Sequence, residues 1–419
     1  MTTTDLIIIG AGPGGYKAAE YAAKQGLKVT IFEAAEVGGT CLNVGCIPTK
    51  TYVHSATFAE ARERLSVVIP QLRSGVEAIL SHPNITLVRS RAQFVDANTV
   101  SSLSGDVVAA KNIIIATGSS TKLLPLPDID DPRVVDSTGL LQLDTLPKRL
   151  AIIGAGIIGM EFASVFHRFG PEVTVIEYLK ECLPALDSDI AKRLRKLLEK
   201  QGITFKMKTA VQNLADIDAD IILMATGRKP NTEGLNLPAV GITLSPNGAI
   251  PVNPDTFAVT APDGFAVGTI YAIGDVNALQ MLAHAAEMQA IRAVNHILGK
   301  QDNIRFDIMP AAIFTTPEAA CVGPTEDQLK AQGIAYECKK SFWRANGKAM
   351  AMGETEGMLK LFAATADGRI LGCHAYGAHA ADIVQEVSAL MCRETTLKQL
   401  RDIIHIHPTL SEILKSAAE

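Results

Sequence analysis

The chain contains the same glycine-rich pattern twice, and this repeat constrains its fold more than any other feature. An apolar run at residues 5–9 leads into Gly10-Ala-Gly12-Pro-Gly-Gly15, and residues 150–153 lead into Gly154-Ala-Gly156-Ile-Ile-Gly159, 144 positions later. An apolar strand, Gly-x-Gly-x-x-Gly and a helix are typical of a βαβ unit that binds a dinucleotide, because the glycines let the backbone approach a pyrophosphate at the helix N-terminus. One such pattern is weak evidence, but two at matching positions predict two units in one α/β chain.

Each pattern is followed by a glutamate at the same distance. Glu33 and Glu177 both come 23 positions after the first glycine of their pattern, at the end of a second apolar run. An acid at this position accepts hydrogen bonds from ribose hydroxyl groups. Glu177 would also repel a 2′-phosphate, and no arginine occurs between it and Arg193, with Lys180 as the nearest basic residue. The second unit is therefore predicted to bind NAD rather than NADP.

Later segments complete the two units. Residues 113–118 and 221–227 are apolar runs that both end in Ala-Thr-Gly, which indicates a closing strand in each half. Residues 270–275 predict a strand that ends in Asp275, shortly before a helical pattern over 281–298. This order places a carboxylate and a helix N-terminus together at a ligand.

The last part of the chain has a different pattern. From about residue 304 it predicts strands at 311–314, 358–363 and 370–376 and a helix at 381–392, without a glycine fingerprint. We interpret this part as a third, α+β domain.

Cys41 and Cys46 lie shortly after the first fingerprint. A disulfide requires Cα atoms about 4.4 to 6.8 Å apart, whereas five residues of regular helix rise about 7.5 Å and point the two side chains apart. A bond between them therefore requires a distorted backbone. Gly38, Gly39 and Gly45 permit φ values that are closed to other residues, and Pro48 lacks an N–H and clashes with the carbonyl of Val44. The alternative is that Cys41 and Cys46 are two unrelated buried thiols. The position of the two cysteines beside the fingerprint favours a redox dithiol that works with a flavin.

The segment His407-Pro-Thr-Leu-Ser-Glu412 near the C-terminus also carries reactive groups. Its ordinary interpretation is a surface loop before a helix, with Thr409 and Glu412 forming a capping box. In a chain with a redox dithiol, His407 instead becomes the candidate base. His405 is expected to be structural.

Composition argues against several functions. The formal net charge is −5 and no run of Lys or Arg stands out, which argues against nucleic acid and anionic membranes as partners. No basic leader, signal-length apolar stretch or membrane-spanning segment is evident, and seven scattered cysteines fit a reducing compartment. We expect a cytoplasmic protein without membrane insertion.

Taken together, the motifs resemble the pyridine nucleotide-disulfide oxidoreductase family over nearly the whole chain. Gly39-Thr40-Cys41 to Lys50 is similar to the family's redox motif, and 407–412 to its acid-base motif. Gly12-Pro13-Gly14-Gly15-Tyr16 and Met281-Leu282-Ala283-His284 are most similar to the dihydrolipoamide dehydrogenase branch. The serine and arginines of glutathione reductases are missing, as are the extra cysteine pairs of thioredoxin and mercuric reductases.

The resemblance implies two Rossmann-like (doubly wound) nucleotide-binding domains of the glutathione reductase type, plus a C-terminal α+β dimerisation domain. The implied boundaries are 1–145 for the first part of the FAD-binding domain, 146–248 for the NAD-binding domain, 249–304 for the second FAD part and 305–419 for the interface domain. The chain is shorter than its relatives in two places. One lies between a helix expected over 51–65 and Pro70, the other between Ala210 and Ile221, where a strand meander normally lies.

The resemblance also implies a function: reoxidation of protein-bound dihydrolipoyl groups with reduction of NAD+ to NADH, by a homodimer with tightly, non-covalently bound FAD and no metal. Cys41 would be the interchange thiol, Cys46 the flavin-side thiol, His407 the base and Glu412 its orienting acid, while Lys50 and Glu161 would pair near the flavin. Partners would be lipoyl-carrying proteins, such as the E2 acyltransferase or the glycine cleavage H protein. The alternatives are an NAD(P)H-dependent reductase of a small disulfide such as glutathione, and a redox-inactive flavoprotein subunit of a multienzyme complex.

The implied cofactor-binding residues fall into two sets. For FAD they are Gly10, Gly12, Pro13, Gly14, Gly15, Glu33, Gly39, Thr40, Lys50, Ala116, Thr117, Gly118, Gly274, Asp275, Met281, Leu282, Ala283 and His284. For NAD they are Gly154, Gly156, Ile157, Ile158, Gly159, Glu161, Glu177, Val211 and Gly227.

Overall fold

The computed structural model describes residues 1–261, 264 and 266–419. The chain divides into two compact units. Unit 1 comprises Met1–Lys122 and Arg228–Ile304, and unit 2 comprises Leu123–Gly227 and Arg305–Glu419. Among the described residues, no helix is both long and apolar enough to cross a membrane.

Unit 1 is built on an eight-stranded mixed sheet whose main path runs β14-β15-β6-β1-β2-β3. Its centre is parallel: β1 (Thr2–Ile9) lies between β2 (Val29–Phe32) and β6 (Val107–Ile115). Residues 6–9 of β1 are fully apolar and buried, as expected for a parallel strand with both faces covered. The other strands are β3 (Ile85–Val88), β4 (Ala92–Asp96), β5 (Thr99–Ser102), β14 (Ala258–Thr260) and β15 (Ala266–Ala272).

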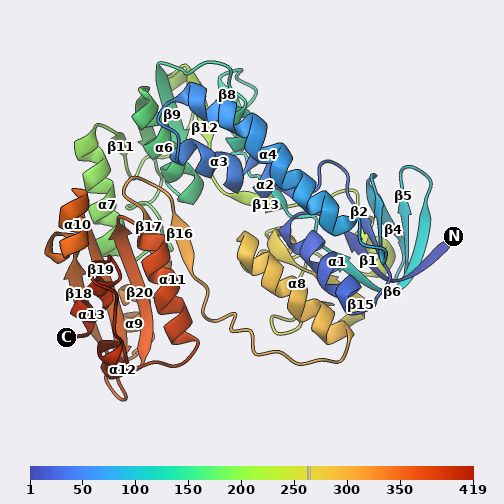
Figure 1. Ribbon diagram of the computed structural model, residues 1–419. Coiled ribbons are helices and arrows are strands. Elements are labelled where there is room, and N and C mark those ends of the chain that lie inside the picture. The colour runs from blue at the N-terminus through green and yellow to red at the C-terminus, as the bar shows by residue number, and fades with distance from the viewer. Residues whose placement is uncertain (262–263, 265) are drawn as a thin grey trace. The chain divides into compact units, whose positions relative to one another are not determined.

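Helices α1 (Pro13–Lys24) and α8 (Ala283–Ile297) pack side by side in unit 1 (Figure 1). Gly14 of α1 permits this close approach, because a Cβ there would lie 3.3 Å from Ala286 Cβ of α8. A hydrogen bond of 2.9 Å from Tyr21 Oη to Asn295 Oδ1 joins the two helices. The core of the sheet also contains apolar residues of the crossover after residue 230, where a short 3₁₀ helix, η2 (Leu237–Val240), contributes Leu237 and Val240.

The segment with the two cysteines forms helices α2 (Gly39–Val44) and α3 (Cys46–Val53), followed by α4 (Phe58–Leu80). The expected helix over 51–65 is therefore wrong. A new helix begins at Phe58 because Thr57 Oγ1 accepts a hydrogen bond from Glu60 N, and Glu60 Oε2 accepts one from Ala56 N. It continues through Pro70, although proline removes one helical hydrogen bond. One continuous helix thus spans the first shortened region.

Unit 2 contains a five-stranded parallel sheet in the order β11-β10-β9-β12-β8. Between Ala210 and Ile221, the second region expected to be shortened, the chain forms no strand and contains only the 3₁₀ helix η1 (Leu214–Asp216). Asp128 Oδ2 accepts hydrogen bonds from Leu214 N and Ala215 N, and Arg133 donates to the carbonyl oxygens of Leu214, Ile217 and Ala219. These polar bonds hold the shortened segment against the sheet. The elements are β8 (Val134–Val135), α5 (Ser137–Leu141), β9 (Arg149–Ile153), α6 (Ile157–Phe169), β10 (Glu172–Ile176), α7 (Ser188–Gln201), β11 (Thr204–Lys206) and β12 (Ile221–Met224).

The C-terminal part of unit 2 is an antiparallel sheet in the order β16-β17-β20-β19-β18. The strands and helix predicted at 311–314, 358–363, 370–376 and 381–392 are confirmed with ends within one residue. This part contains β16 (Ala311–Ile313), β17 (Ala319–Val322), α9 (Glu326–Ala331), β18 (Tyr336–Phe342), α10 (Gly347–Met352), β19 (Gly357–Ala364), β20 (Ile370–Gly377), α11 (Ala380–Met391), α12 (Leu397–Asp402) and α13 (Glu412–Ala418). The predicted α/β class, with two doubly wound sheets and an α+β C-terminal part, is confirmed.

Candidate active site

The first glycine fingerprint lies where the strand order of unit 1 changes direction, between β1 and β6, which is where open parallel sheets bind ligands. The backbone there is too close for side chains. A Cβ on Gly10 would be 2.4 Å from Ala116 O, and one on Gly15 would be 1.8 Å from Gly10 O. Gly12 caps α1 without a side-chain bond, so the first N–H groups of the helix are not used by a capping side chain. This cradle fits the pyrophosphate of a dinucleotide.

The second fingerprint reproduces this geometry in unit 2. A Cβ on Gly154 would be 2.4 Å from Ala225 O, and one on Gly159 would be 2.0 Å from Gly154 O. Gly156 caps α6 without a side-chain bond, as Gly12 caps α1. Val211, predicted to bind NAD, packs against the apolar cluster beside this sheet. The predicted repeat is therefore a repeat of backbone contacts.

The two repeated glutamates are held in the same way. Glu33 Oε2 accepts a hydrogen bond from Ala11 N at 2.7 Å and its Oε1 one from Ala35 N at 2.8 Å. Glu177 Oε2 accepts from Ala155 N at 2.6 Å and its Oε1 from Leu179 N at 2.7 Å. Each carboxylate is thus fixed beside its fingerprint turn by main-chain amides, which suits a group that binds ribose hydroxyls.

Cys41 and Cys46 lie on opposite sides of a helix break. Cys41 is in α2, and Cys46 is the first residue of α3; between them Gly45 has φ −138° and ψ −110°, which are not helical. The predicted backbone distortion is confirmed. Hydrogen bonding with Cys46, followed by burial, raises the pKa of Cys41. Cys46 is exposed at the N-terminus of α3, where the helix dipole favours a thiolate. Helix α2 also begins close to the first fingerprint, since a Cβ on its first residue, Gly39, would be 2.8 Å from Gly12 Cα.

Asp275 is positioned by two residues that the sequence analysis missed. Asp275 is not at a strand end, since β15 ends at Ala272 and Asp275 lies in the 3₁₀ helix η3 (Gly274–Asn277). Ser119 Oγ donates to Asp275 Oδ2, and Arg228 Nε lies 3.6 Å from the same oxygen and donates to Ser119 Oγ at 2.6 Å. A signal existed: these two residues each follow one of the Ala-Thr-Gly motifs. Their strands, β7 (Ser119–Thr121) and β13 (Arg228–Pro230), pair with each other.

Helix α8 begins at Ala283 rather than Met281, with Leu282 as an N-cap that makes no side-chain bond. Its first turn is therefore not capped by a side chain, which suits a partial negative charge on a ligand. Gln289 of α8 accepts hydrogen bonds from Gly274 N at 2.7 Å and from Asn277 Nδ2 at 3.0 Å. The predicted pair of Asp275 and a helix N-terminus is thus joined through buried Gln289.

Lys50 and Glu161 lie in different units, and their pairing stays a prediction. Glu161 is no ordinary surface residue: it is 4 % exposed, and its Oε1 accepts a hydrogen bond from Phe314 N at 2.9 Å. Lys50 is partly exposed, in α3, four residues after Cys46.

His407 and Glu412 form a contact pair in unit 2. His407 Nδ1 lies 2.9 Å from Glu412 Oε1, while Glu412 Oε2 accepts a hydrogen bond from Thr409 N at 2.9 Å. Helix α13 begins at Glu412 with Ser411 as its N-cap, so Thr409 does not form the ordinary capping box. The bond from Thr409 N, and then that with His407, lowers the pKa of Glu412. His405 instead has a side chain only 5 % exposed, 3.0 Å from Glu386 Oε1, which supports its structural assignment.

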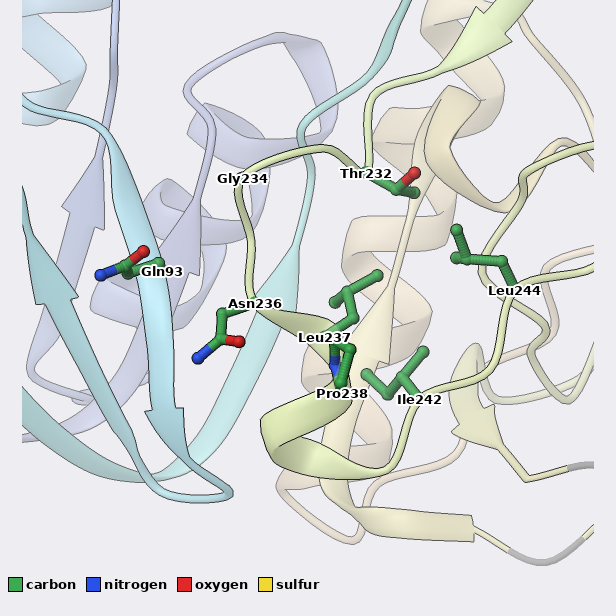
Figure 2. A pocket seen from close by; sticks show the side chains of 8 residues that line it. All are labelled: Gln93, Thr232, Gly234, Asn236, Leu237, Pro238, Ile242 and Leu244. Carbon is green, nitrogen blue, oxygen red and sulfur yellow. The ribbon is translucent and has the colours of Figure 1, made fainter.

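One surface cavity of about 470 Å³ lies elsewhere in unit 1 (Figure 2). Its lining combines apolar side chains of the crossover with Gln93 of β4, and it includes none of the predicted site residues: Gln93, Thr232, Gly234, Asn236, Leu237, Pro238, Ile242 and Leu244. Among the described residues, no group of three or more His, Cys, Asp or Glu is arranged to hold a metal ion.

Comparison with known proteins agrees with this geometry. The pyridine nucleotide-disulphide oxidoreductase pattern matches residues 4–290, and the dimerisation domain of the same family matches 309–418. The mitochondrial dihydrolipoyl dehydrogenase of Pisum sativum is 37 % identical over 460 aligned positions, covering 99 % of this chain and 90 % of the pea protein. Dihydrolipoyl dehydrogenase 3 of Pseudomonas putida is 37 % identical, and the alignment covers 100 % of this chain and 98 % of the Pseudomonas protein.

A solved structure supports the same assignment. The HOCl-induced flavoprotein disulfide reductase RclA of Escherichia coli has a TM-score of 0.92 and 31 % identity, with 99 % of each chain covered. The family uses FAD and NAD(H), and both fingerprints fit such dinucleotides. The chain belongs to the pyridine nucleotide-disulphide oxidoreductase family.

Proposed function

We propose that this protein is a dihydrolipoyl dehydrogenase, which oxidises dihydrolipoyl groups carried by other proteins and reduces NAD+ to NADH. The observation that carries the proposal is the contact between the dithiol segment and the first fingerprint. Gly38 N donates to Ala11 O at 2.8 Å, and Gly39 packs against Gly12. The two cysteines are thus attached to the turn that would hold the pyrophosphate of FAD.

The thiol chemistry follows from the acid-base pair. With Glu412 accepting the Nδ1 proton, Nε2 of His407 is left free to accept a proton from a substrate thiol. The resulting thiolate attacks Cys41 of the Cys41–Cys46 disulfide, a new substrate–Cys41 bond forms, and Cys46 leaves as a thiolate. The second substrate thiol then displaces Cys41, which releases the lipoyl disulfide and a reduced Cys41–Cys46 pair. The chemistry that FAD would supply at this site is transfer of this electron pair to NAD+ as hydride.

Further residues would hold the cofactors. Glu33 and the fingerprint glycines would bind the ADP part of FAD, Asp275 its ribityl chain, and Lys50, Glu161 and the start of α8 the charge on its ring system. Glu177 would select NAD. The proposal includes the three-domain division, in which two separate segments of the chain form the FAD-binding domain.

We further propose a homodimer in which His407 of each chain serves the dithiol of the other. The last segment of unit 2 exposes unusually apolar residues beside the pair: Ile404 is 96 % exposed and Ile406 is 78 % exposed. Exposed apolar side chains that lie close together can mark a protein–protein interface, and the C-terminal part matches the family's dimerisation domain. A reducing compartment such as the cytoplasm suits a catalytic dithiol. Lipoyl-carrying proteins, an E2 acyltransferase or the glycine cleavage H protein, would be the substrates.

NADH formation from free dihydrolipoamide and NAD+ tests the function. Parallel assays supply NADP+ in place of NAD+, and NAD(P)H with glutathione disulfide. Turnover with dihydrolipoamide and NAD+ is expected to be the fastest of these reactions. Faster reduction of glutathione disulfide would support the small-disulfide reductase, and a flavin-loaded protein inactive in all assays would support the structural subunit.

A further inference from the structure

Helix α4 binds the redox helix α2 through one arginine. Arg73 of α4 donates two hydrogen bonds to Asn43 Oδ1, from Nε at 3.0 Å and from Nη2 at 2.8 Å. Its Nη1 lies 3.5 Å from Glu36 Oε2, in the turn that precedes α2. One planar guanidinium therefore contacts both the end of α2 and the turn before it.

The side-chain amide of Asn43 uses all of its ordinary bonding capacity. While Oδ1 accepts twice from Arg73, Nδ2 donates to Val37 O at 3.0 Å and to Gly39 O at 2.9 Å. Asn43 thus ties the last turn of α2 to its first residue. Asn43 stands between the two cysteines in the chain, two positions after Cys41.

Helix α2 needs such support. It has six residues, whereas isolated helices shorter than about 12 residues are marginal in water. Its connection to α3 is broken at Gly45. The position of Cys41 relative to Cys46 therefore depends on contacts of α2 with its surroundings, and these contacts include the charge-assisted hydrogen bonds from Arg73 to Asn43.

We propose that Arg73 is a positioning residue for the redox dithiol: through Asn43 it holds α2 so that Cys41 stays within bonding reach of Cys46. This inference rests on the proposed function only in taking the two cysteines as the redox pair. Holding two thiols together raises their effective concentration, which favours the disulfide and lowers its reduction potential. Loss of Arg73 should therefore shift the thiol–disulfide equilibrium toward the dithiol form, relative to wild type.

The test measures the thiol–disulfide equilibrium of the flavin-loaded protein. Wild type, Arg73→Gln, Arg73→Lys and the control Arg89→Gln are equilibrated with mixtures of reduced and oxidised dithiothreitol, then alkylated, and the Cys41–Cys46 peptide is quantified by mass spectrometry. The control removes Arg89, an exposed arginine that contacts Glu77 at 2.9 Å; Glu77 lies in α4, the helix that also contains Arg73. Arg73→Gln should shift the equilibrium toward the dithiol about tenfold, which is about 30 mV. Arg73→Lys should shift it less, because lysine lacks the two-pronged fork.

A double-mutant cycle tests the route. If Arg73 acts through Asn43, Arg73→Gln combined with Asn43→Ala should shift the equilibrium no further than Asn43→Ala alone. Flavin content and circular dichroism are measured first, and if Arg73→Gln does not fold, Arg73→Lys decides. A wild-type equilibrium in a folded Arg73 variant, or an equal shift in Arg89→Gln, overturns the proposal. If wild type equilibrates normally but forms no NADH from dihydrolipoamide, the proposed function fails while the role of Arg73 stands.

Discussion

Lys360 and Asp187 form an ion pair of 2.7 Å whose two side chains are each 1 % exposed. Lys360 also contacts Glu326 Oε2 at 2.6 Å, so one ammonium group joins β19, α9 and the N-cap of α7. Burial lowers the pKa of Lys360, but its bonds to both carboxylates outweigh burial and raise it. The group stays charged inside unit 2, between the second nucleotide-binding sheet and the C-terminal sheet.

Removing this charge should destabilise unit 2. Lys360→Met leaves the buried carboxylate of Asp187 without its cation, and breaking a buried pair in this way costs about 3 to 5 kcal/mol. Denaturant unfolding should show this loss, whereas Lys339→Met on the neighbouring strand, where the pair with Glu337 is partly exposed at 3.6 Å, should change stability by less than about 1 kcal/mol. Equal effects of the two substitutions would contradict the assignment.

Acid should destabilise the protein through the same cluster. Burial lowers the pKa of His374 to about 4, and its Nδ1 accepts a hydrogen bond from Asp187 N at 3.0 Å. Below its ordinary pKa the unfolded chain binds a proton that the folded chain refuses, so stability falls as pH drops from about 6.5 toward 4. The bond with Lys360 lowers the pKa of Glu326 to about 2, so its contribution is lost between about pH 4.5 and 2.

Urea midpoints at pH 7 and pH 5 check the histidine. His374→Asn is expected to cost stability at pH 7 because the ring is completely buried, but to make the difference between the two pH values smaller than in wild type. An unchanged difference would show that His374 does not cause the acid sensitivity.

The nicotinamide preference should depend on Glu177. Its fixed carboxylate repels a 2′-phosphate, so wild type should use NAD+ with a higher kcat/KM than NADP+. Glu177→Gln removes the charge and should lower the ratio of kcat/KM for NAD+ to kcat/KM for NADP+ by about tenfold or more, mostly by weakening the binding of NAD+. The matched change Glu172→Gln, at the exposed start of β10, the strand that Glu177 directly follows, is the control. A wild-type preference for NADP+ would refute the role.

The two cysteines should give different spectra. Two-electron reduction of the flavin-loaded protein should produce a long-wavelength absorbance band from the Cys46 thiolate, which the N-terminus of α3 stabilises. Cys46→Ser should abolish the band, and Cys41→Ser should show it without a reductant. The reverse result would mean that the roles of the two sulfurs are exchanged.

A shared active site predicts complementation between inactive chains. Heterodimers of Cys46→Ser and His407→Gln contain one site with both cysteines and an intact His407, so mixing should restore activity. Homodimers of either variant serve as controls. If heterodimers form and activity stays at the parental level, or if sedimentation shows an active monomer, His407 does not serve a partner chain.

Features set by local sequence were predictable. The glycines of both fingerprints, the repeated glutamates and the backbone distortion between the two cysteines belong to motifs that can be recognised in the sequence, and the structure shows each in the expected arrangement. The path of α4 was not predictable, because proline inside a helix normally ends or kinks it, and here α4 continues through Pro70.

Contacts between distant side chains were not predictable either. Lys360 and Asp187 are 173 positions apart, and Arg73 and Asn43 are 30 apart, so neither pair forms a pattern in the sequence. Ser119 and Arg228 were closer to prediction, because each follows an Ala-Thr-Gly motif. The roles of Cys41 and His407 stay predictions that the experiments above address, and the roles of Lys50 and Glu161 also stay predictions.

The shortened segment after β11 is held by bonds to its main chain. Arg133 binds carbonyl oxygens and Asp128 binds amides, and neither bond depends on which side chains the segment carries. Substitutions at the exposed positions of this segment should therefore leave its attachment to the sheet intact, whereas substitutions of Asp128 or Arg133 should weaken it. The surface of this segment can therefore change in sequence while the hydrogen bonds that hold its main chain stay the same.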